Sequence, residues 1–338
     1  MNWDEVNWES LDRLRGLYLN ATPTPESYWL SEADLASYDF TYAQRIAWKW
    51  LAVLRDLDRQ RWKPGPGPLL DWGCGSGVAS RCVLSHFGAA NFESVALHDR
   101  SGLAVEFATG RVKARFPRLS VVSGSGLLES EAPVGTLVLS HILNELPPET
   151  HTELAGIVRR AQTVIWVEPG TRDVSRALSN VRDRLVGEFR VVAPCTHRAA
   201  CGMLAAGNEQ HWCHFFADPP AEIFTDSGWS RFAQRAGIDL RSLPYSYLVL
   251  ERIPVDPNPE PSPGLTRVIG RPRIHKGYMK IFGCDRAGVT EPMLQQRDAP
   301  ETFRQFKAGR AASLQQWSVV KGKIEKIEEV PSQAPGVD

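Results

Sequence analysis

The sequence predicts an α/β fold with a mostly parallel sheet and helices on both faces. Three observations support this: short apolar runs recur along the middle of the chain, helical stretches separate them, and the first run breaks into alternating glycines. Apolar runs of this length suit buried strands better than helices. Strands that alternate with helices form parallel sheets, whose ligands collect at the strands' carboxyl ends. The expected strands are residues 69–72, 93–99, 119–122, 136–139, 163–170 and, after an insert, 245–251.

The first strand leads into a turn that suits a nucleotide-like ligand. Residues 69–77 read LLDWGCGSG, with glycines at Gly73, Gly75 and Gly77, and a helix is expected from about Val78. Glycine accepts positive φ and close approach of a ligand, and the helix N-terminus offers unpaired N–H groups. The pattern is G-x-G-x-G and lacks the third glycine of G-x-G-x-x-G, which weakens NAD or FAD as ligands. A purely structural strand–helix corner is the alternative.

The second strand ends in Asp99, where a doubly wound sheet places the carboxylate that accepts hydrogen bonds from ribose hydroxyls. The chain at this point resembles the class I S-adenosylmethionine-dependent methyltransferases, which have a Rossmann-like fold. The residues that carry the resemblance are Asp71, Gly73, Gly75, Gly77 and Asp99. The resemblance implies S-adenosylmethionine as cofactor and methyl transfer as activity, and it does not indicate the substrate.

Further strand ends lie on the same expected rim. They place Ser123, His141 and Glu168 near the cofactor site, and we take Ser123 and His141 as cofactor-pocket candidates. His141 is equally well explained as the start of a helix. The sequence contains neither the N/D-P-P-Y/F loop of amino-directed base methyltransferases nor a convincing general base. No catalytic residue is therefore assigned from the sequence.

Composition limits the class of protein. With 338 residues, 43% of them apolar, the chain can bury the core of a large domain and a smaller one. The formal net charge is zero, so contact with nucleic acid requires a local basic face. Apolar runs are strand-sized, and the N-terminus resembles neither a secretion signal nor a transit peptide. We expect a soluble, cytoplasmic protein with no membrane partner.

Three regions are expected along the chain. Residues 1–64 form an N-terminal helical cap, because apolar groups recur at helical spacing and the proline-rich stretch 63–68 then stops any helix. Residues 65–253 form the methyltransferase-like domain, with a cysteine-rich insert at about 193–219. Residues 254–338 comprise a proline-rich linker and a small C-terminal β extension with a basic face.

Four of the six cysteines form a candidate metal site. They are spaced C-x5-C-x11-C, with a distant fourth, at Cys195, Cys201, Cys213 and Cys284. Four thiolates suit an iron–sulfur cluster. Zinc could use three of them with His197, His211 or His214, although the paired knuckles of structural zinc sites are missing. Buried thiols are a third explanation, and Cys195 as the nucleophile of a C5-cytosine methyltransferase is a fourth.

The context of these cysteines resembles a narrower family, the mitoribosomal small-subunit Rsm22 family of the mitochondrial methyltransferase-like protein seventeen and its bacterial relatives. The resemblance covers roughly residues 40 to 290 and is carried by EPGT at 168–171, APCTH at 193–197, WCHF at 212–215, YSY at 245–247 and CDRAG at 284–288. It implies that Cys195, Cys201, Cys213 and Cys284 hold a [4Fe-4S] cluster. Thr196 and Gly202 stand where proline is expected after the first two ligands.

The same resemblance implies action on the small ribosomal subunit or its ribosomal RNA during assembly, in the bacterial cytoplasm or the mitochondrial matrix of a eukaryote. A basic cluster beyond the linker suits contact with RNA phosphates, and a solvated basic face is the alternative. The basic cluster comprises Arg267, Arg271, Arg273, Lys276, Lys280 and Arg286. Two functions are consistent with the sequence: an rRNA methyltransferase, and an assembly factor that binds RNA without transferring a methyl group. We expect a monomer.

Overall fold

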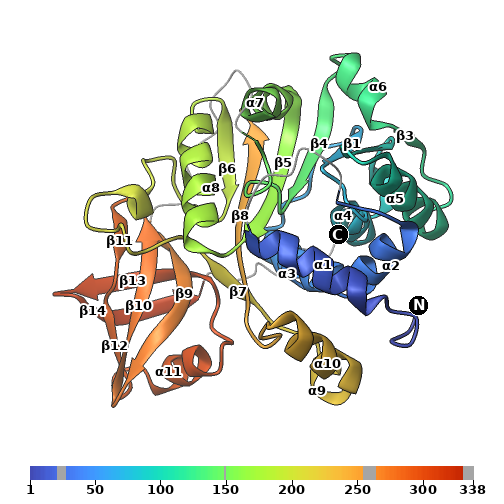
Figure 1. Cartoon of the computed structure of the whole chain (residues 1–338). Helices are drawn as coiled ribbons and strands as arrows, with labels where there is room; N and C mark the ends of the chain where they lie inside the picture. Colours follow the sequence, from blue (N-terminus) through green and yellow to red (C-terminus); the bar gives the residue numbers. More distant parts are fainter. Residues whose placement is uncertain (21–27, 148–149, 254–263, 330–338) are drawn as a thin grey trace, which may run out of the picture. The chain divides into compact units, whose positions relative to one another are not determined.

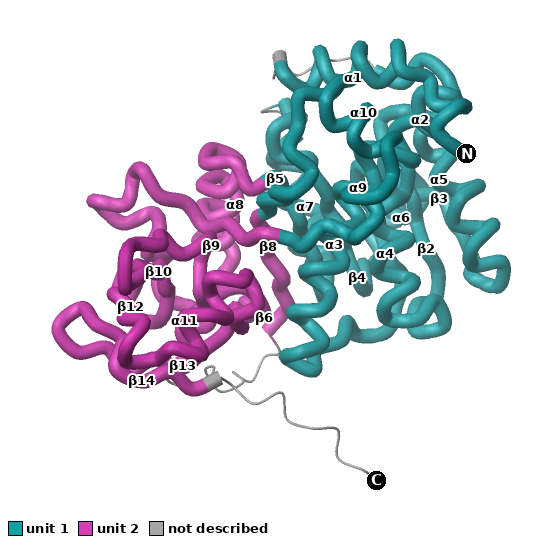
Figure 2. The backbone as a smooth tube through the Cα atoms, turned by 90° about the horizontal axis from the view of Figure 1, so that it is seen from below, with its two compact units in different colours: residues 1–169, 217–245 teal, residues 170–216, 246–338 magenta. Residues whose placement is uncertain are grey.

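The computed structural model describes residues 1–20, 28–147, 150–253 and 264–329 (Figure 1). The chain divides into two compact units, which are described separately below (Figure 2). Unit 1 comprises residues 1–169 and 217–245, and unit 2 comprises residues 170–216 and 246–338. Among the described residues, no helix is long and apolar enough to cross a membrane.

The residues of unit 1 that the structure describes form five parallel strands in the order β3-β2-β1-β4-β5. Their burial explains their composition: Leu69, Leu70, Leu137 and Val138 are fully buried, as expected for strands covered on both faces. The strands are β1 (Leu69–Trp72), β2 (Val95–His98), β3 (Val121–Ser123), β4 (Val134–Ser140) and β5 (Ala161–Pro169). The expected fold class, α/β with a mostly parallel sheet, is confirmed.

Helices connect these strands, and their placement follows from the strand order. The chain moves from β1 to β2 and β3 on one side, and then crosses to β4 and β5 on the other. Because such crossovers are right-handed, this reversal places helices on both faces of the sheet. The helices are α4 (Val78–Phe87), α5 (Gly102–Arg115), α6 (Gly124–Glu129) and α7 (Thr150–Arg160). The strand order reverses direction at β1, and the glycine turn follows the end of this strand.

In the described part of residues 1–64, the range predicted as the N-terminal cap, the structure has three helices, α1 (Trp8–Asn20), α2 (Glu32–Phe40) and α3 (Tyr42–Arg59). A later segment, α9 (Glu222–Thr225) and α10 (Ser227–Ala236), packs on them. The indole of Trp3 donates to Asp226 Oδ2 at 2.8 Å, and its ring meets Trp229 edge-on at 5.1 Å. The cap is therefore completed by residues far along the chain, a pairing that the sequence did not suggest.

Unit 2 begins with α8 (Arg172–Leu185) and β6 (Phe189–Ala193), which pairs antiparallel with β8 (Leu243–Arg252). Between β6 and β8 lie a 3₁₀ helix, η2 (Gly202–Leu204), and β7 (Phe215–Ala217), which pairs with β8. The cysteine-rich segment expected at about 193–219 lies in this interval, and η2 and β7 are its short regular elements.

The rest of unit 2 is a second sheet, larger than the small β extension expected. Its order is β11-β10-β12-β14-β13-β9, and β9 also pairs with β10, which closes the sheet into a barrel. The interior holds Met279 and Ile281, both fully buried, with Phe303 and Phe306 of α11 (Pro300–Lys307). The strands are β9 (Leu265–His275), β10 (Tyr278–Asp285), β11 (Gly288–Thr290), β12 (Met293–Gln295), β13 (Leu314–Val320) and β14 (Lys323–Glu329).

Candidate functional site

The glycine turn after β1 has the backbone that its sequence predicts. Gly73, Gly75 and Gly77 all have positive φ, at 75°, 50° and 73°. The backbone N–H groups of Gly73 and Cys74 both donate to the carbonyl oxygen of His98, at 2.8 and 2.9 Å. The turn is thus fastened to the end of β2, which brings Asp99 beside it.

The three glycines serve different purposes. A Cβ on Gly73 would lie 3.0 Å from Ile142 Cγ2, and one on Gly77 would lie 3.0 Å from Ala108 Cβ, so both are packed closely. A Cβ on Gly75 would meet nothing within 4 Å among the residues that the structure describes. Gly75 therefore presents open backbone, where a ligand can approach closely.

Asp99 is aligned by the turn. Its Oδ2 accepts from the N–H of Gly75 at 2.9 Å, and its Oδ1 accepts from the N–H of Ser101 at 2.9 Å. Each carboxylate oxygen can accept more than one hydrogen bond, so both retain capacity for a ligand. The predicted partners Gly75 and Asp99 are in direct contact.

Asp71 has a different position from Asp99. It is fully buried, its Oδ2 accepts from the N–H of Ser80 at 3.1 Å, and its Oδ1 has no partner among the described residues. Burial raises the pKa of Asp71 to about 6. Because Ser80 lies in the first turn of α4, Asp71 ties β1 to that helix and supports the turn from behind.

Ser123 and His141 lie at other strand ends. Ser123 pairs with Leu97 across β3 and β2, and its Oγ accepts from the N–H of Gly126 at 3.3 Å, which caps α6. His141 has a positive φ of 58°, and its N–H donates to the carbonyl oxygen of Val167 at 2.9 Å. Burial, with the charges of Lys49 and Arg45, lowers the pKa of His141, so its imidazole is neutral near pH 7.

Sequence reasoning missed Glu145, five residues beyond the end of β4. The hydroxyl of Tyr28 donates to Glu145 Oε2 at 3.2 Å, and the guanidinium of Arg100 lies 5.4 Å from the Tyr28 ring centroid. Burial raises the pKa of Glu145 to about 7, and the charge of Asp99 adds to this. Glu145 interacts electrostatically with Asp99. A carboxyl with a pKa of about 7 can exchange a proton near neutral pH. Its partner comes from the distant N-terminal region, so no local pattern marked it.

A second cap residue, Asp39, supports the glycine turn. Arg81 donates from Nε to the carbonyl oxygen of Gly77 at 3.1 Å and forms an ion pair with Asp39, which is 2% exposed. Arg111 Nη2 lies 3.0 Å from the other oxygen of Asp39. Helix α2 therefore fixes the turn through a buried carboxylate bridging two arginines.

A buried polar group anchors the loop that follows β4. Glu168 is fully buried, and its Oε1 accepts from the N–H groups of Ile142 and Leu143 at 3.1 and 3.2 Å and from the indole of Trp166 at 2.7 Å. Burial raises the pKa of Glu168 to about 7. Lys49 on α3, 6% exposed, has its pKa lowered by burial to about 7. Glu168 thus supports the loop from within rather than forming part of an open rim.

The four candidate metal ligands all belong to unit 2, and the structure brings them into one neighbourhood. Burial raises the pKa of Cys213, and the charges of Cys195, Cys201 and Cys284 raise it further. The pKa of Cys284 is likewise raised by burial and then by Cys195 and Cys201. Thiols that interact electrostatically in this way lie close together, although they come from four separate places in the sequence.

Backbone contacts explain why these cysteines meet. Cys284 pairs with Val289 across β10 and β11, and the amide of Val289 lies 2.8 Å from the position of a Cβ on Gly202. Only glycine fits there, so Cys201, the preceding residue, lies next to β11, the strand that pairs with the end of β10 where Cys284 lies. Ser246 on β8 donates from Oγ to the carbonyl oxygen of Cys213 at 3.0 Å.

Two arginines and a histidine complete this region. Arg182, 2% exposed, donates to the carbonyl oxygens of His197 and Ala199, both at 2.6 Å, and its charge lowers the pKa of Cys195 against the effect of burial. Arg267 donates to the carbonyl oxygen of Pro194 at 2.7 Å. His197 Nε2 lies 3.5 Å from Cys284 Sγ. Within the described residues, no group of three or more His, Cys, Asp or Glu side chains could hold a metal ion.

The fold and the glycine turn define a doubly wound α/β domain with a nucleotide-type turn and an acid at the end of its second strand. The particular family follows from the sequence. The chain belongs to the family described as mitochondrial small ribosomal subunit Rsm22, which matches residues 42–314. The family resemblance carried by the cysteine context is thereby confirmed.

Solved structures give weaker likenesses. The N-methyltransferase NodS from Bradyrhizobium japonicum, in complex with S-adenosyl-L-homocysteine, has 11% identity, a TM-score of 0.38, and coverage of 70% of this chain and 98% of its own. An rRNA methylase from Streptococcus thermophilus has 11% identity, a TM-score of 0.34, and coverage of 60% and 95%. No curated protein matches the sequence. The family assignment therefore rests on the sequence match.

One prediction concerns the buried ammonium of Lys49. Between about pH 7 and about pH 10, the unfolded chain holds a proton on Lys49 that the folded protein has released, so this group makes the unfolding free energy rise with pH. Lys49→Met keeps the length of the side chain and removes the charge. Urea unfolding should show the variant to be more stable than the native protein near about pH 6, by up to a few kcal/mol, with the difference closing toward about pH 10.

Lys113→Met on the exposed side of α5 is the matched control, and its stability should follow that of the native protein at every pH. Parallel curves for Lys49→Met and the native protein would show that Lys49 keeps its proton when buried.

Proposed function

We propose that unit 1 binds S-adenosylmethionine at the glycine turn. The observation that carries this is the contact between Gly75 and Asp99: open backbone at Gly75 lies beside a carboxylate that the turn itself aligns. Asp99 would accept hydrogen bonds from the ribose hydroxyls, and Gly73, Gly75 and Gly77 would admit the ligand to the backbone. Asp71 would hold the turn from behind, and Ser123 and His141 would complete the pocket from neighbouring strand ends.

The bound cofactor would supply an electrophilic methyl group for transfer to a nucleophile. The protein's contribution would be to orient the two reactants and to exclude water, as in other transfers that depend on position. Glu145 is suited to accept a proton from the nucleophile, because its carboxyl has a pKa of about 7 and interacts with Asp99. This assigns a chemical role where the sequence assigned none.

We further propose that the substrate is ribosomal RNA of the small subunit, in the bacterial cytoplasm or the mitochondrial matrix according to the source of the chain. The family description, mitochondrial small ribosomal subunit, supports this partner. A non-catalytic assembly factor that uses the same fold to bind RNA is the second candidate, favoured by the absence of a recognised catalytic motif in the sequence.

The four cysteines are proposed to hold a [4Fe-4S] cluster, with zinc as the alternative. The mutual electrostatic effects of Cys195, Cys201, Cys213 and Cys284 support a shared site, and iron–sulfur clusters prefer four thiolates. The ligands of a cubane surround a cluster and do not converge on a single ion. A bound cluster would join the segment after β6 to the barrel strand β10, so that metal affinity would become folding energy for unit 2.

The cofactor site can be tested with alanine at two glycines. Gly75→Ala and Gly207→Ala both introduce a side chain at positive φ into space that is open among the described residues, so each should lose about 1–2 kcal/mol of stability. Titration calorimetry should show S-adenosylmethionine binding at least about tenfold weaker for Gly75→Ala, a loss of about 1.4 kcal/mol, and unchanged for Gly207→Ala. Asp99→Asn should also weaken binding. Unchanged affinity in both Gly75→Ala and Asp99→Asn would remove the turn from the site.

The choice between enzyme and assembly factor is decided by mass spectrometry of small-subunit RNA from a deletion strain. If the protein is an enzyme, the deletion strain should lack the methyl group at one position of this RNA. Gly75→Ala should reproduce that loss, because it blocks the cofactor site without changing unit 2. An unchanged modification map together with a defect in subunit assembly would reject the enzyme and favour the assembly factor.

The metal site is tested on protein purified without oxygen. Native protein should be brown, with the broad visible absorption of an iron–sulfur cluster and about four irons per chain. Cys284→Ser should lose iron and colour, whereas Cys82→Ser, at a cysteine outside the set on α4, should keep both. One zinc per chain in colourless native protein would replace the cluster by the zinc alternative.

A further inference from the structure

The barrel of unit 2 has a known strand arrangement. Taken in chain order, its strands β9, β10, β12, β13 and β14 occur in the ring β9-β10-β12-β14-β13, and β9 pairs with both β10 and β13. The third and fifth strands pair in parallel, and α11 connects the third strand to the fourth. This is the topology of the OB-fold, a five-stranded barrel that binds oligonucleotides on the face of its second and third strands. A fold alone does not establish binding, so the face itself must supply the chemistry.

The side chains of β10 alternate between the inside and the outside of the barrel, and this alternation defines the outer face. Met279 and Ile281 point into the barrel and are fully buried. Tyr278, Lys280 and Phe282 therefore point outward. Cross-strand neighbours extend this outer face, because paired residues lie on the same side of a sheet. Tyr278 pairs with Gln295 on β12 and His275 on β9, and Lys280 pairs with Met293 and Arg273.

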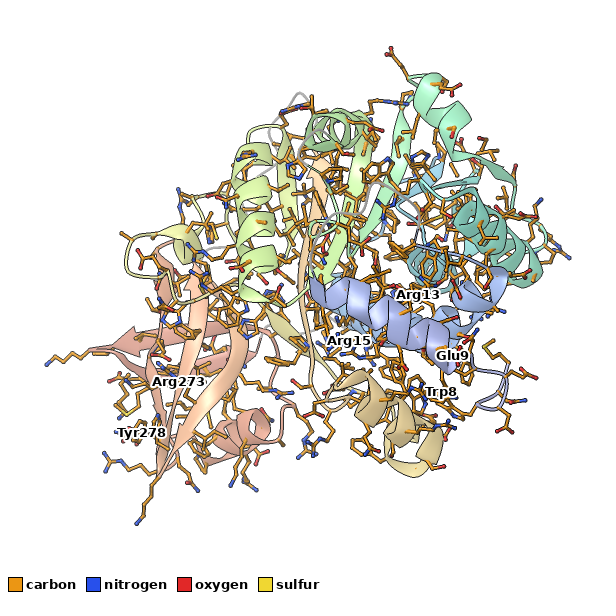
Figure 3. All side chains as sticks on the ribbon, in the orientation of Figure 1. Trp8, Glu9, Arg13, Arg15, Arg273 and Tyr278 are labelled. Atoms are coloured by element: carbon orange, nitrogen blue, oxygen red, sulfur yellow. The ribbon has the colours of Figure 1, made fainter. Side chains whose placement is uncertain are left out.

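The outer face carries planar rings. The rings of His275 and Tyr278 are stacked, with centroids 4.6 Å apart and an angle of 12° between their planes. Beyond them, the guanidinium of Arg273 lies 5.6 Å from the Phe282 ring centroid. Figure 3 labels Arg273 and Tyr278 on the barrel. Stacked rings at a surface offer a platform on which an unpaired base can stack.

Charge on this face favours a polyanion. Residues 265–284 include five Lys or Arg and no Asp or Glu. One of the five, Arg267, is buried and donates to the carbonyl oxygen of Pro194, so this member of the predicted basic cluster does not contribute to the face. Arg273 and Lys276 are exposed, and Lys276 lies in the loop between the first and second barrel strands, where OB-folds contact their ligands. Glu291 pairs with Arg273 and reduces its charge in part. The other end of the face is covered, since His211 of the cysteine-bearing segment packs on Phe282 at 4.7 Å.

We propose that the outer face of β9, β10 and β12 binds single-stranded RNA, with bases stacked on Tyr278 and His275 and phosphates at Arg273, Lys276 and Lys280. The choice of RNA rests on the function proposed above, whereas the single-stranded form follows from the rings, which a paired base could not reach. Cys284 lies two residues beyond Phe282 on the same strand and face. The cysteine site therefore borders the RNA face and fixes the strand that carries it.

The test is fluorescence anisotropy of the full-length protein with a labelled, unstructured RNA of about ten nucleotides, within the range that one OB-fold covers. Tyr278→Ala should weaken binding roughly 5- to 100-fold, as loss of one stacked base does. Tyr278→Phe keeps the ring and should bind within about twofold of the native protein. Lys280→Ala should lower the slope of log affinity against log salt by about 0.7.

Arg304→Ala is the control for charge and folding, because this side chain is 70% exposed on α11, and it should bind as the native protein does. A duplex of the same length should bind more weakly than the single strand. Equal losses for Tyr278→Ala and Arg304→Ala, or equal affinity for duplex and single strand, would overturn the proposal. The assay contains no cofactor, so it tests this face even if the protein does not methylate RNA. If the protein methylates RNA but Tyr278→Ala leaves RNA binding unchanged, the proposed face is rejected and the proposed enzyme is not.

Discussion

The burial of Asp71 is the constraint on which the glycine turn of unit 1 depends. A carboxyl at the end of a central strand loses its hydration, which is costly unless hydrogen bonds replace it. The N–H of Ser80 provides one such bond, and the helix that contains Ser80 is thereby held at the end of β1. The connecting turn has little room, so glycines take the positive φ angles and place Gly75 against Asp99. Asp39 and Arg81 then fix the outside of the same turn from the N-terminal cap.

In unit 2, strand β10 has the corresponding role. Its inward residues Met279 and Ile281 form the barrel core, and its outward residues run from Tyr278 through Lys280 and Phe282 to Cys284. A change that displaces Cys284 therefore also moves the aromatic and basic face, because both belong to one rigid strand. If the four cysteines hold the proposed cluster, its loss would loosen the strand that carries the proposed RNA face.

The sequence predicted those features that local patterns determine. Strands such as residues 69–72 and 163–170 are apolar runs ended by glycine or an acid, and the turn at Gly73, Gly75 and Gly77 has a pattern that short-range sterics explain. The barrel was missed because its strands carry no such runs: β14 reads KIEKIEE, in which charge hides the inward position of Ile324. Closure also requires β9 to pair with β13, forty-odd residues away, which no local pattern shows. Glu145 was missed for a related reason, since Tyr28 sets its environment from the other end of the chain.

The two units need not share one activity. The proposed cofactor binding would depend on the turn, Asp99 and the cap, all in unit 1, whereas the cysteines, the barrel and the basic face all belong to unit 2. If methyl transfer were lost in evolution, the proposed RNA face would remain intact, because neither His275 nor Tyr278 contributes to the turn. The reverse would not hold, since an rRNA methyltransferase of this architecture that lost the proposed RNA face would no longer hold its substrate. An assembly factor can thus arise from an enzyme of this architecture by losing unit 1 chemistry alone, and the buried groups Asp71 and Glu168 would persist in it for stability.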